Sequence, residues 1–293
     1  MDKPESRLGY ESERTQTCRQ LLITLVRKLG PWRNKLILVG GLVPYLLFED
    51  GDHAGTTDID LVINPTDVED VESYRTLEQN FRKIGLRRGI SLEGQAQHFR
   101  WTISDHEGRE TASLDLLCPS SEGEAGKVLA LKDFGEKRLS AIGIPGARLV
   151  FDDYQEIELR GELLGGRGKT KVTVRIVGLV AYIVLKALAF KERCEPKDAY
   201  DLIYVLIRSE PEQLGQAFGR KMVDNPNENL YSEALDVFKE SFLDDEEVLG
   251  VEKEGPVQYA RFVEPTDLEE QAIAAQDAAG VVELFVRAAS KMD

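Results

Sequence analysis

The sequence predicts an α+β protein whose first 177 residues form a mixed sheet with helices and whose residues 178–293 form a helical domain. Two observations lead to this prediction. Short apolar runs of strand character alternate with helical patterns in the first part, and long helical patterns follow in the second. The length of 293 residues is close to two domains of roughly 150 residues each, enough to bury a core without disulfide or metal cross-links.

Local patterns predict the individual elements. Apolar residues at three- and four-residue spacing predict a helix over residues 13–29, which Gly30 and Pro31 end. In chain order, the elements expected after it are a strand at 35–39, a short helix at 42–48, a polar loop at 49–57, a strand at 58–63, a helix at 67–81, strands at 97–103 and 111–118, a helix around 126–138 and a hairpin at 155–177. The helical half has one expected exception, a short extended stretch near Val257–Val263.

Composition excludes several classes of protein. With 42% hydrophobic and 30% charged residues, the chain is neither disordered nor of low complexity. No apolar run reaches the ~18 residues that span a bilayer, and the N-terminal residues are too polar for a signal peptide. Cys18, Cys118 and Cys194 are far apart and form no CxxC motif. We therefore expect a cytoplasmic protein with free thiols and no membrane partner.

The negative charge of the chain is concentrated near its C-terminus. The net charge is −15, and residues 211–293 hold 7 Lys and Arg against 19 Asp and Glu. The first two thirds are nearly neutral and contain a basic cluster at 82–88 and a basic ribbon at 160–175. These groups permit a polyanionic substrate but do not require one, since scattered solvated charges produce the same pattern.

Two carboxylates at i and i+2 are the strongest chemical signal in the sequence. Asp58 and Asp60 lie in an expected strand, so both point to one face while Ile59 and Leu61 point to the other. Adjacent like charges are tolerated mainly where a cation neutralises them, and oxygen ligands on a rigid strand suit Mg²⁺ completed by substrate phosphates. The alternative is that Asp58 and Asp60 lie on the solvent face of an amphipathic strand.

Asp115 supplies a candidate third carboxylate. It interrupts the apolar strand Ser113–Leu117, where an acid is costly to bury without a partner. If this strand pairs beside 58–63, three carboxylates meet, and we expect them to bind Mg²⁺ or Mn²⁺. Upstream, Gly40 and Gly41 lie between a buried strand and a helix, where glycine lets the backbone approach a phosphate closely. A glycine pair on its own is otherwise only a turn.

Charged residues on two expected helices form a second group. Lys186 interrupts the apolar body of the helix that follows residue 178, and an inward lysine needs an anion such as a triphosphate. The alternative is a lysine whose stem lies on apolar surface while its ammonium reaches water. Asp198 and Asp201 share a helix face next to Lys197. In the alternative for this segment, Pro196, Lys197 and Asp198 are simply the first turn of a helix, where acids favour the dipole.

These motifs carry a resemblance to a known family. The order Leu38-Val-Gly-Gly41, Asp58-Ile-Asp60 and Asp115 resembles the nucleotidyltransferase (polymerase-beta-like) superfamily, although 16 residues separate Gly41 from Asp58 instead of about a dozen. The segments Lys186–Arg193 and Lys197–Asp201 resemble the helical motifs of its AbiEii family, which includes MenT-type toxins. The resemblance covers roughly residues 15–210.

The resemblance implies a nucleotidyltransferase-like sheet core with a helical C-terminal domain, and an activity. A nucleoside monophosphate would pass from an NTP to a macromolecular acceptor such as the 3′ end of tRNA, in a toxin restrained by a cognate antitoxin. Asp58, Asp60 and Asp115 would hold the metal, Lys186 would also be catalytic, and Gly40, Gly41, Thr57, Lys186 and Asp198 would bind the nucleotide. In related toxins a hydroxyl near Thr57 can be a regulatory phosphorylation site, whereas Thr57 is otherwise only a strand-entry threonine. Transfer to an antibiotic-like small molecule and a non-catalytic binding module are the alternatives.

Overall fold

The chain divides into two units, each with its own core. The computed structural model describes residues 4–48, 52–67, 71–91, 94–121, 123–134 and 137–292. One unit consists of Glu11–Leu46 and Gly55–Gly178 and carries the sheet. The other consists of Met1–Tyr10, Leu47–Ala54 and Leu179–Asp293 and is helical. Two short N-terminal segments thus belong to the helical unit, which no local pattern in the sequence indicated.

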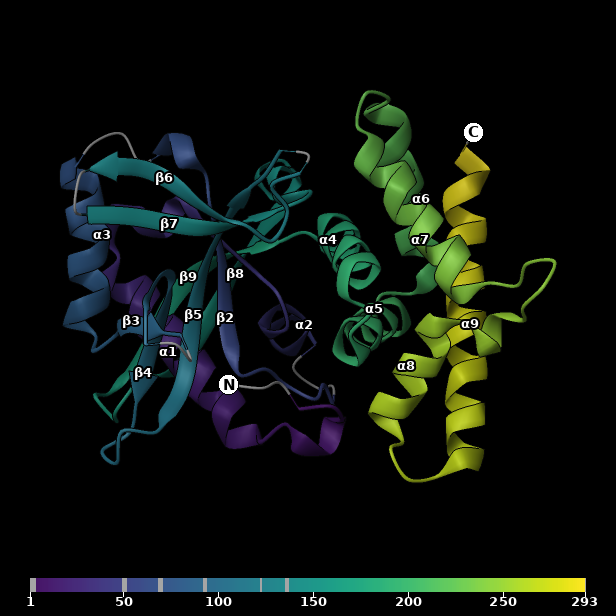
Figure 1. The fold of residues 1–293 in the computed structure, drawn as a ribbon, viewed down its shortest axis with the longest axis horizontal. Helices are drawn as coiled ribbons and strands as arrows, with labels where there is room; N and C mark the ends of the chain where they lie inside the picture. Colours follow the sequence, from purple (N-terminus) through teal and green to yellow (C-terminus); the bar gives the residue numbers. More distant parts are fainter. Residues whose placement is uncertain are drawn as a thin grey trace. The chain divides into compact units, whose positions relative to one another are not determined.

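The sheet unit is built on a mixed sheet, most of whose strands are labelled in Figure 1. The strand order is β3-β4-β5-β2-β1-β9-β8. The pair β2 and β5 is parallel, as is the pair β1 and β9, while the other neighbours in this order are antiparallel. β7 pairs with the end of β5, and β6 pairs with β7. The bounds are β1 Leu36–Val39, β2 Asp58–Ile63, β3 Arg87–Ile90, β4 Ala96–Ser104, β5 Glu110–Pro119, β6 Val128–Phe134, β7 Lys137–Ile144, β8 Tyr154–Glu162 and β9 Lys169–Val177.

Two helices cover one face of this sheet. α1 (Ser12–Lys28) packs on β5, β8 and β9 and contacts α3 (Val71–Lys83). On α3, the Phe81 ring meets Trp101 of β4 edge to face at 5.1 Å between centroids. Trp101 pairs with Leu114 of β5, which pairs with Ile59 of β2. These apolar side chains are therefore on the helix-covered face, and the residues that alternate with them point to the opposite face.

The helical unit packs around aromatic side chains. Phe285 contacts the rings of Phe218 and Phe238, with centroids 5.4 and 5.0 Å apart. A second aromatic cluster joins Tyr200, Tyr204 and Phe262, all of them buried. The helices of this unit are α4 Leu179–Arg193, α5 Pro196–Arg208, α6 Pro211–Asp224, α7 Asn229–Phe242, α8 Glu254–Val263 and α9 Leu268–Ala289. The short helix α2 (Leu42–Leu47) follows β1, and its residues up to Leu46 belong to the sheet unit.

The structure confirms the α+β class and corrects two expected elements. Of the residues around 126–138, residues 128–134 form β6 and residues 137–138 begin β7 instead of a helix, because β6 pairs with β7 and β7 adds to the sheet beside β5, pairings that no local pattern encodes. Residues 135–136 of this expected helix lie outside the described residues. Residues 257–263 belong to the helix α8 instead of an extended stretch, because Ala260 and Phe262 are buried in packing with α5 and α9. Part of two other expectations, residues 49–51 of the polar loop and residues 68–70 of the helix at 67–81, lies outside the described residues.

Bilayer-spanning segments were not expected from the sequence. Across the parts of the chain that the structure describes, no helix combines the length and the apolarity that crossing a membrane requires.

Candidate functional site

Asp58, Asp60 and Asp115 point to the same face of the sheet. β2 and β5 run parallel in a register that sets Asp60 opposite Asp115 and Asp58 opposite Ser113. Since paired residues in a ladder share a face, the three carboxylates are on the face opposite the one that α1 and α3 cover. Asp58 and Asp60 are half-buried, whereas Asp115 is buried with 5% of its surface exposed.

Asp115 is held by an arginine from the next strand. Arg100 of β4 is its register partner, and the guanidinium engages both carboxylate oxygens, with Nε 2.7 Å from Oδ1 and Nη2 2.5 Å from Oδ2. This bidentate arrangement is among the strongest side-chain pairings in proteins. The hydrogen bond to Asp115 raises the pKa of Arg100, so the guanidinium stays charged. A cation thus already neutralises the third carboxylate.

The acidic pair fits a divalent cation better than the acidic triad does. Asp58 and Asp60 offer oxygen ligands side by side on one rigid strand, and Mg²⁺ is commonly held by one or two carboxylates with substrate phosphates completing its shell. Within the described residues, no group of three or more His, Cys, Asp or Glu side chains is arranged to hold a metal ion. Both oxygens of Asp115 are engaged by Arg100.

Gly40 and Gly41 form the turn between β1 and α2, next to the acidic pair. Gly40 has a φ of +75°, which side chains other than glycine rarely adopt, and a β-carbon there would overlap Oδ2 of Asp60. Close packing against Asp60 is therefore one requirement for glycine at position 40. α2 has only six residues, which is too short for its N-terminus to form an anion site. Phosphate binding by Gly40 and Gly41 stays a prediction.

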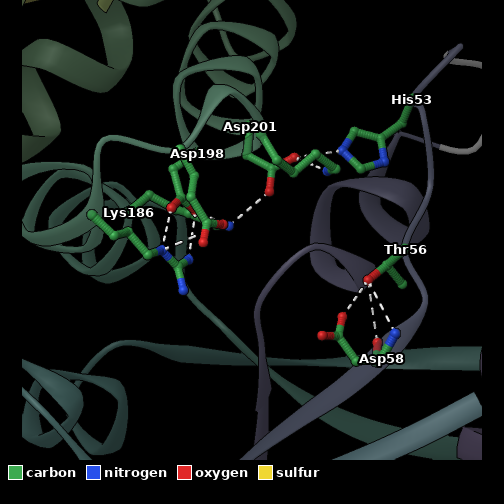
Figure 2. A network of polar contacts seen from close by, with 9 residues as sticks. His53, Thr56, Asp58, Lys186, Asp198 and Asp201 are labelled. Carbon is green, nitrogen blue, oxygen red and sulfur yellow. Dashed lines mark hydrogen bonds and ion pairs between the residues drawn. The ribbon is translucent and has the colours of Figure 1, made fainter. Parts of the chain in front are cut away.

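Threonine hydroxyls surround the start of β2. Thr56 is buried, and its Oγ1 donates a hydrogen bond to Oδ1 of Asp58 at 2.8 Å (Figure 2). The backbone N–H of Thr56 donates to Oγ1 of Thr15 on α1, which fixes this segment on the sheet. The structure therefore shows Thr56 orienting Asp58, while the expected role of Thr57, the half-buried neighbour, stays a prediction.

Lys186 and Asp198 belong to the helical unit, where they contact each other. Nζ of Lys186, on α4, is 2.9 Å from Oδ1 of Asp198 and 2.7 Å from Oδ2 of Asp201, both on α5 (Figure 2). Lys186 is 9% exposed, and the two acids are 1% and 0% exposed. The anion that an inward lysine requires is thus supplied by the fold itself.

Three further residues complete this buried charge cluster. Arg193 binds Asp198 through Nε at 2.6 Å and Nη2 at 2.9 Å, and Lys197 forms an ion pair with Asp201. Nε2 of His53 lies 3.0 Å from Oδ1 of Asp201. The side chain of Arg193 is 43% exposed, so solvent reaches the cluster at this residue.

The neighbouring charges in the cluster determine the protonation state of each of its members. Burial alone would raise the pKa of Asp198, but Lys186 and Arg193 outweigh it and lower that pKa to about 2. Burial works against the charge of Lys186, yet Asp201 and Asp198 raise its pKa well above the ordinary value. Burial and the ammonium of Lys197 lower the pKa of His53 to about 4, so His53 is neutral near pH 7.

Sequence patterns did not identify Arg100, His53 and Thr56 as members of these clusters. Arg100 alternates with the core residue Trp101, so a strand assignment places it on the polar face, but its pairing with Asp115 requires the register. His53 shows no metal-ligand spacing in the sequence, and its partner Asp201 is 148 residues away in the chain. No sequence signal points to that contact.

The basic ribbon is matched by acids in the hairpin β8–β9. Arg175 pairs with Glu156, and Lys171 and Arg160 pair with Glu158. These ion pairs reduce the positive charge that the ribbon presents. The basic residues of the ribbon therefore stabilise the hairpin by pairing with its acids, and a polyanionic ligand is not needed to explain them.

Comparisons with known proteins add little to this description. No family model and no curated protein matches the chain. Among solved structures, the crystal structure of JHP933 from Helicobacter pylori is similar over 96% of this chain and 95% of that one, with 12% sequence identity and a TM-score of 0.36. A similarity at this level says nothing about activity.

Proposed function

We propose that the protein is a metal-dependent nucleotidyltransferase. The observation that supports this most directly is the placement of Asp58 and Asp60 on one face of β2, with Asp115 opposite Asp60 on β5. Two adjacent carboxylates on a rigid strand are suited to a divalent cation that also binds a triphosphate. The order of the motifs resembles the nucleotidyltransferase superfamily and its AbiEii family.

The proposed reaction transfers a nucleoside monophosphate. An acceptor hydroxyl oxygen forms a bond to the α-phosphorus of an NTP, the bond from that phosphorus to the β-phosphate oxygen breaks, pyrophosphate leaves, and the hydroxyl proton passes to water. Mg²⁺ or Mn²⁺, when bound, stabilises the charge on the entering and departing oxygens. Asp58 and Asp60 would hold it, and Thr56 orients Asp58 through its hydroxyl.

The resemblance also assigns roles outside the acidic pair, and we keep them as part of the proposal. Gly40, Gly41 and Thr57 would contact the nucleotide, as would Lys186 and Asp198. Because Lys186 is buried between Asp198 and Asp201, its contribution would include positioning the segment that carries Arg193, the exposed cation of that cluster. The acceptor proposed by the same resemblance is tRNA or another RNA, in a cytoplasmic toxin with a cognate antitoxin.

Label transfer tests the proposal. Each α-labelled NTP is incubated with the protein, Mg²⁺ or Mn²⁺, and total RNA, total protein or aminoglycoside-type small molecules as acceptors. We expect transfer to RNA by the wild-type chain and its loss in Asp58→Asn and Asp60→Asn, with Asp67→Asn, beyond the end of β2, as the matched control. Transfer that persists in both site variants would contradict the proposal, and transfer to the small molecules would favour the antibiotic-type alternative.

A binding module on the same fold is a second candidate, and one observation favours it. Lys186 and Asp115, which the sequence suggested for catalysis, both have internal partners in the structure. A chain that binds no nucleotide would keep such pairs for stability alone. Absence of divalent-cation-dependent nucleotide binding in the wild-type chain would favour the module.

A further inference from the structure

The pairing of Arg100 with Asp115 joins a partly accessible cation to an inaccessible anion. The side chain of Arg100 is 28% exposed, whereas that of Asp115 is 7% exposed. Both oxygens of the carboxylate face the guanidinium, at 2.7 and 2.5 Å. Solvent and ligands therefore reach this pair through the arginine.

Arg100 shares its surroundings with the acidic pair. The register places Arg100, Asp115 and Asp60 in one row across β4, β5 and β2, with all three on the same face. Asp58 also raises the pKa of Arg100, although less than the hydrogen bond to Asp115 does. The guanidinium thus contacts Asp115 and is also influenced by the charge of Asp58.

A guanidinium and a divalent cation compete for the same carboxylate oxygens. While Arg100 engages both oxygens, it occupies one lone pair of each, and its positive charge opposes a divalent cation beside Asp115. A triphosphate offers Arg100 another pair of anionic oxygens that its guanidinium can bind in the same bidentate way. Because Arg100 is the exposed partner, it can turn toward a phosphate while Asp115 stays on its strand.

We propose that Arg100 is a positioning residue that holds Asp115 in the free chain and exchanges it for the phosphates of an incoming nucleoside triphosphate. The inference rests on the proposed function. It makes the third carboxylate available to a divalent cation only when the substrate is present. Binding of the triphosphate and binding of the cation are then positively coupled, and Arg100 carries the coupling.

Mn²⁺ titration followed by electron paramagnetic resonance tests the exchange. Affinity is measured for the full chain with and without a mixture of non-hydrolysable analogues of the four nucleoside triphosphates. In the wild-type chain we expect the analogues to increase Mn²⁺ affinity about tenfold or more. In Arg100→Met we expect Mn²⁺ alone to bind about tenfold more tightly than to wild type, because Asp115 is released. The analogues should then raise the Mn²⁺ affinity by a smaller factor than in wild type, because only their own ligation of Mn²⁺ remains.

Arg109→Met is the matched control. Arg109 pairs with Asp105 in the turn between β4 and β5, and its side chain is 71% exposed. We expect its Mn²⁺ affinity and its response to the analogues to match wild type. If Arg100→Met does not fold because Asp115 is left buried without a cation, Arg100→Lys replaces it. A lysine keeps the charge but loses the bidentate fork, so intermediate Mn²⁺ affinity is expected.

Two results would overturn the inference. One is equal Mn²⁺ affinity of the free wild-type chain and the folded Arg100 variant. The other is a tighter Arg100 variant without any effect of the analogues on wild type, because Arg100 would then block Asp115 without exchanging it. Failure of the proposed function looks different: coupling in the wild-type chain with no label transfer to any acceptor would end that proposal and leave the exchange intact.

Discussion

Asp60 and Asp115 lie directly opposite each other across the parallel strands β2 and β5. Parallel pairing gives them a shared face, and Arg100 extends the same row from β4. The row explains how two acids from separate parts of the chain lie side by side, because the guanidinium neutralises one of them. On this face of the sheet, Asp58 and Asp60 form the adjacent acidic pair, while Asp115 is neutralised by Arg100.

The packing of Gly40 against Asp60 predicts the effect of a single methyl group. In Gly40→Ala, the β-carbon overlaps Oδ2 of Asp60 and the backbone keeps a positive φ. We expect a loss of stability of about 2 kcal/mol or more, since the left-handed conformation alone costs roughly 1–2 kcal/mol and the overlap adds to it. Urea unfolding of both proteins measures the difference.

Gly108→Ala is the control for this prediction. Gly108 has a φ of +81°, but no atom lies within 4 Å of a β-carbon built there. It therefore reports the conformational cost alone. Equal destabilisation by the two substitutions would show that the contact with Asp60 contributes nothing.

The buried charge cluster predicts that Lys186 is required for folding stability. Lys186→Met leaves Asp198 and Asp201 buried with fewer cations, and breaking a buried pair in this way typically costs about 3–5 kcal/mol. Lys191→Met, on the same helix, is the matched control. The ammonium of Lys191 pairs with Glu233 and its side chain is 52% exposed, so we expect this variant to lose only about 0–1 kcal/mol of stability. Chemical unfolding of both variants measures this contrast, and similar losses would contradict the role assigned to the cluster.

His53 predicts a loss of stability in weak acid. Its pKa is about 4 in the folded chain against an ordinary value of 6.5, so the unfolded chain binds more protons between these values. The contribution of neutral His53 is complete above pH 6.5 and is lost progressively as the pH falls toward 4. Between pH 7 and pH 5 this loss amounts to about 2 kcal/mol.

Urea unfolding at pH 7 and pH 5 checks the assignment to His53. His53→Gln keeps a hydrogen-bond donor toward Asp201 but does not titrate. We expect the stability of this variant to fall by about 2 kcal/mol less than that of wild type over the same interval. An unchanged pH dependence would show that His53 is not the group responsible.

The sequence was sufficient to predict the acidic strands. In Asp58-Ile-Asp-Leu-Val-Ile63 the acids alternate with Ile59 and Leu61, and in β5 Leu114 and Leu116 flank Asp115. Alternation is a local property, so it fixes which side chains share a face of a strand. The observed spans of β2 and β5 follow these patterns closely.

What the sequence did not predict depends on contacts distant along the chain. β6 forms by pairing with β7, which itself pairs with β5, whereas the local pattern predicted a helix around 126–138, where β6 lies. Val257, Tyr259 and Phe262 are typical strand formers, yet packing on other helices makes α8 helical. In the candidate site, the pairing of Arg100 with Asp115 depends on the register between β4 and β5, and the contact of His53 with Asp201 spans 148 residues.

Calorimetric titration of the full chain with a nucleoside triphosphate tests the central claim most directly. The four triphosphates are titrated in turn, with and without Mg²⁺, into wild type, the double variant Asp58→Asn/Asp60→Asn and the control Asp67→Asn. We predict Mg²⁺-dependent binding of at least one triphosphate by wild type and control, and its loss in the double variant. Equal Mg²⁺-dependent binding by all three proteins, or none by wild type, would contradict the assignment of Asp58 and Asp60 as the cation ligands.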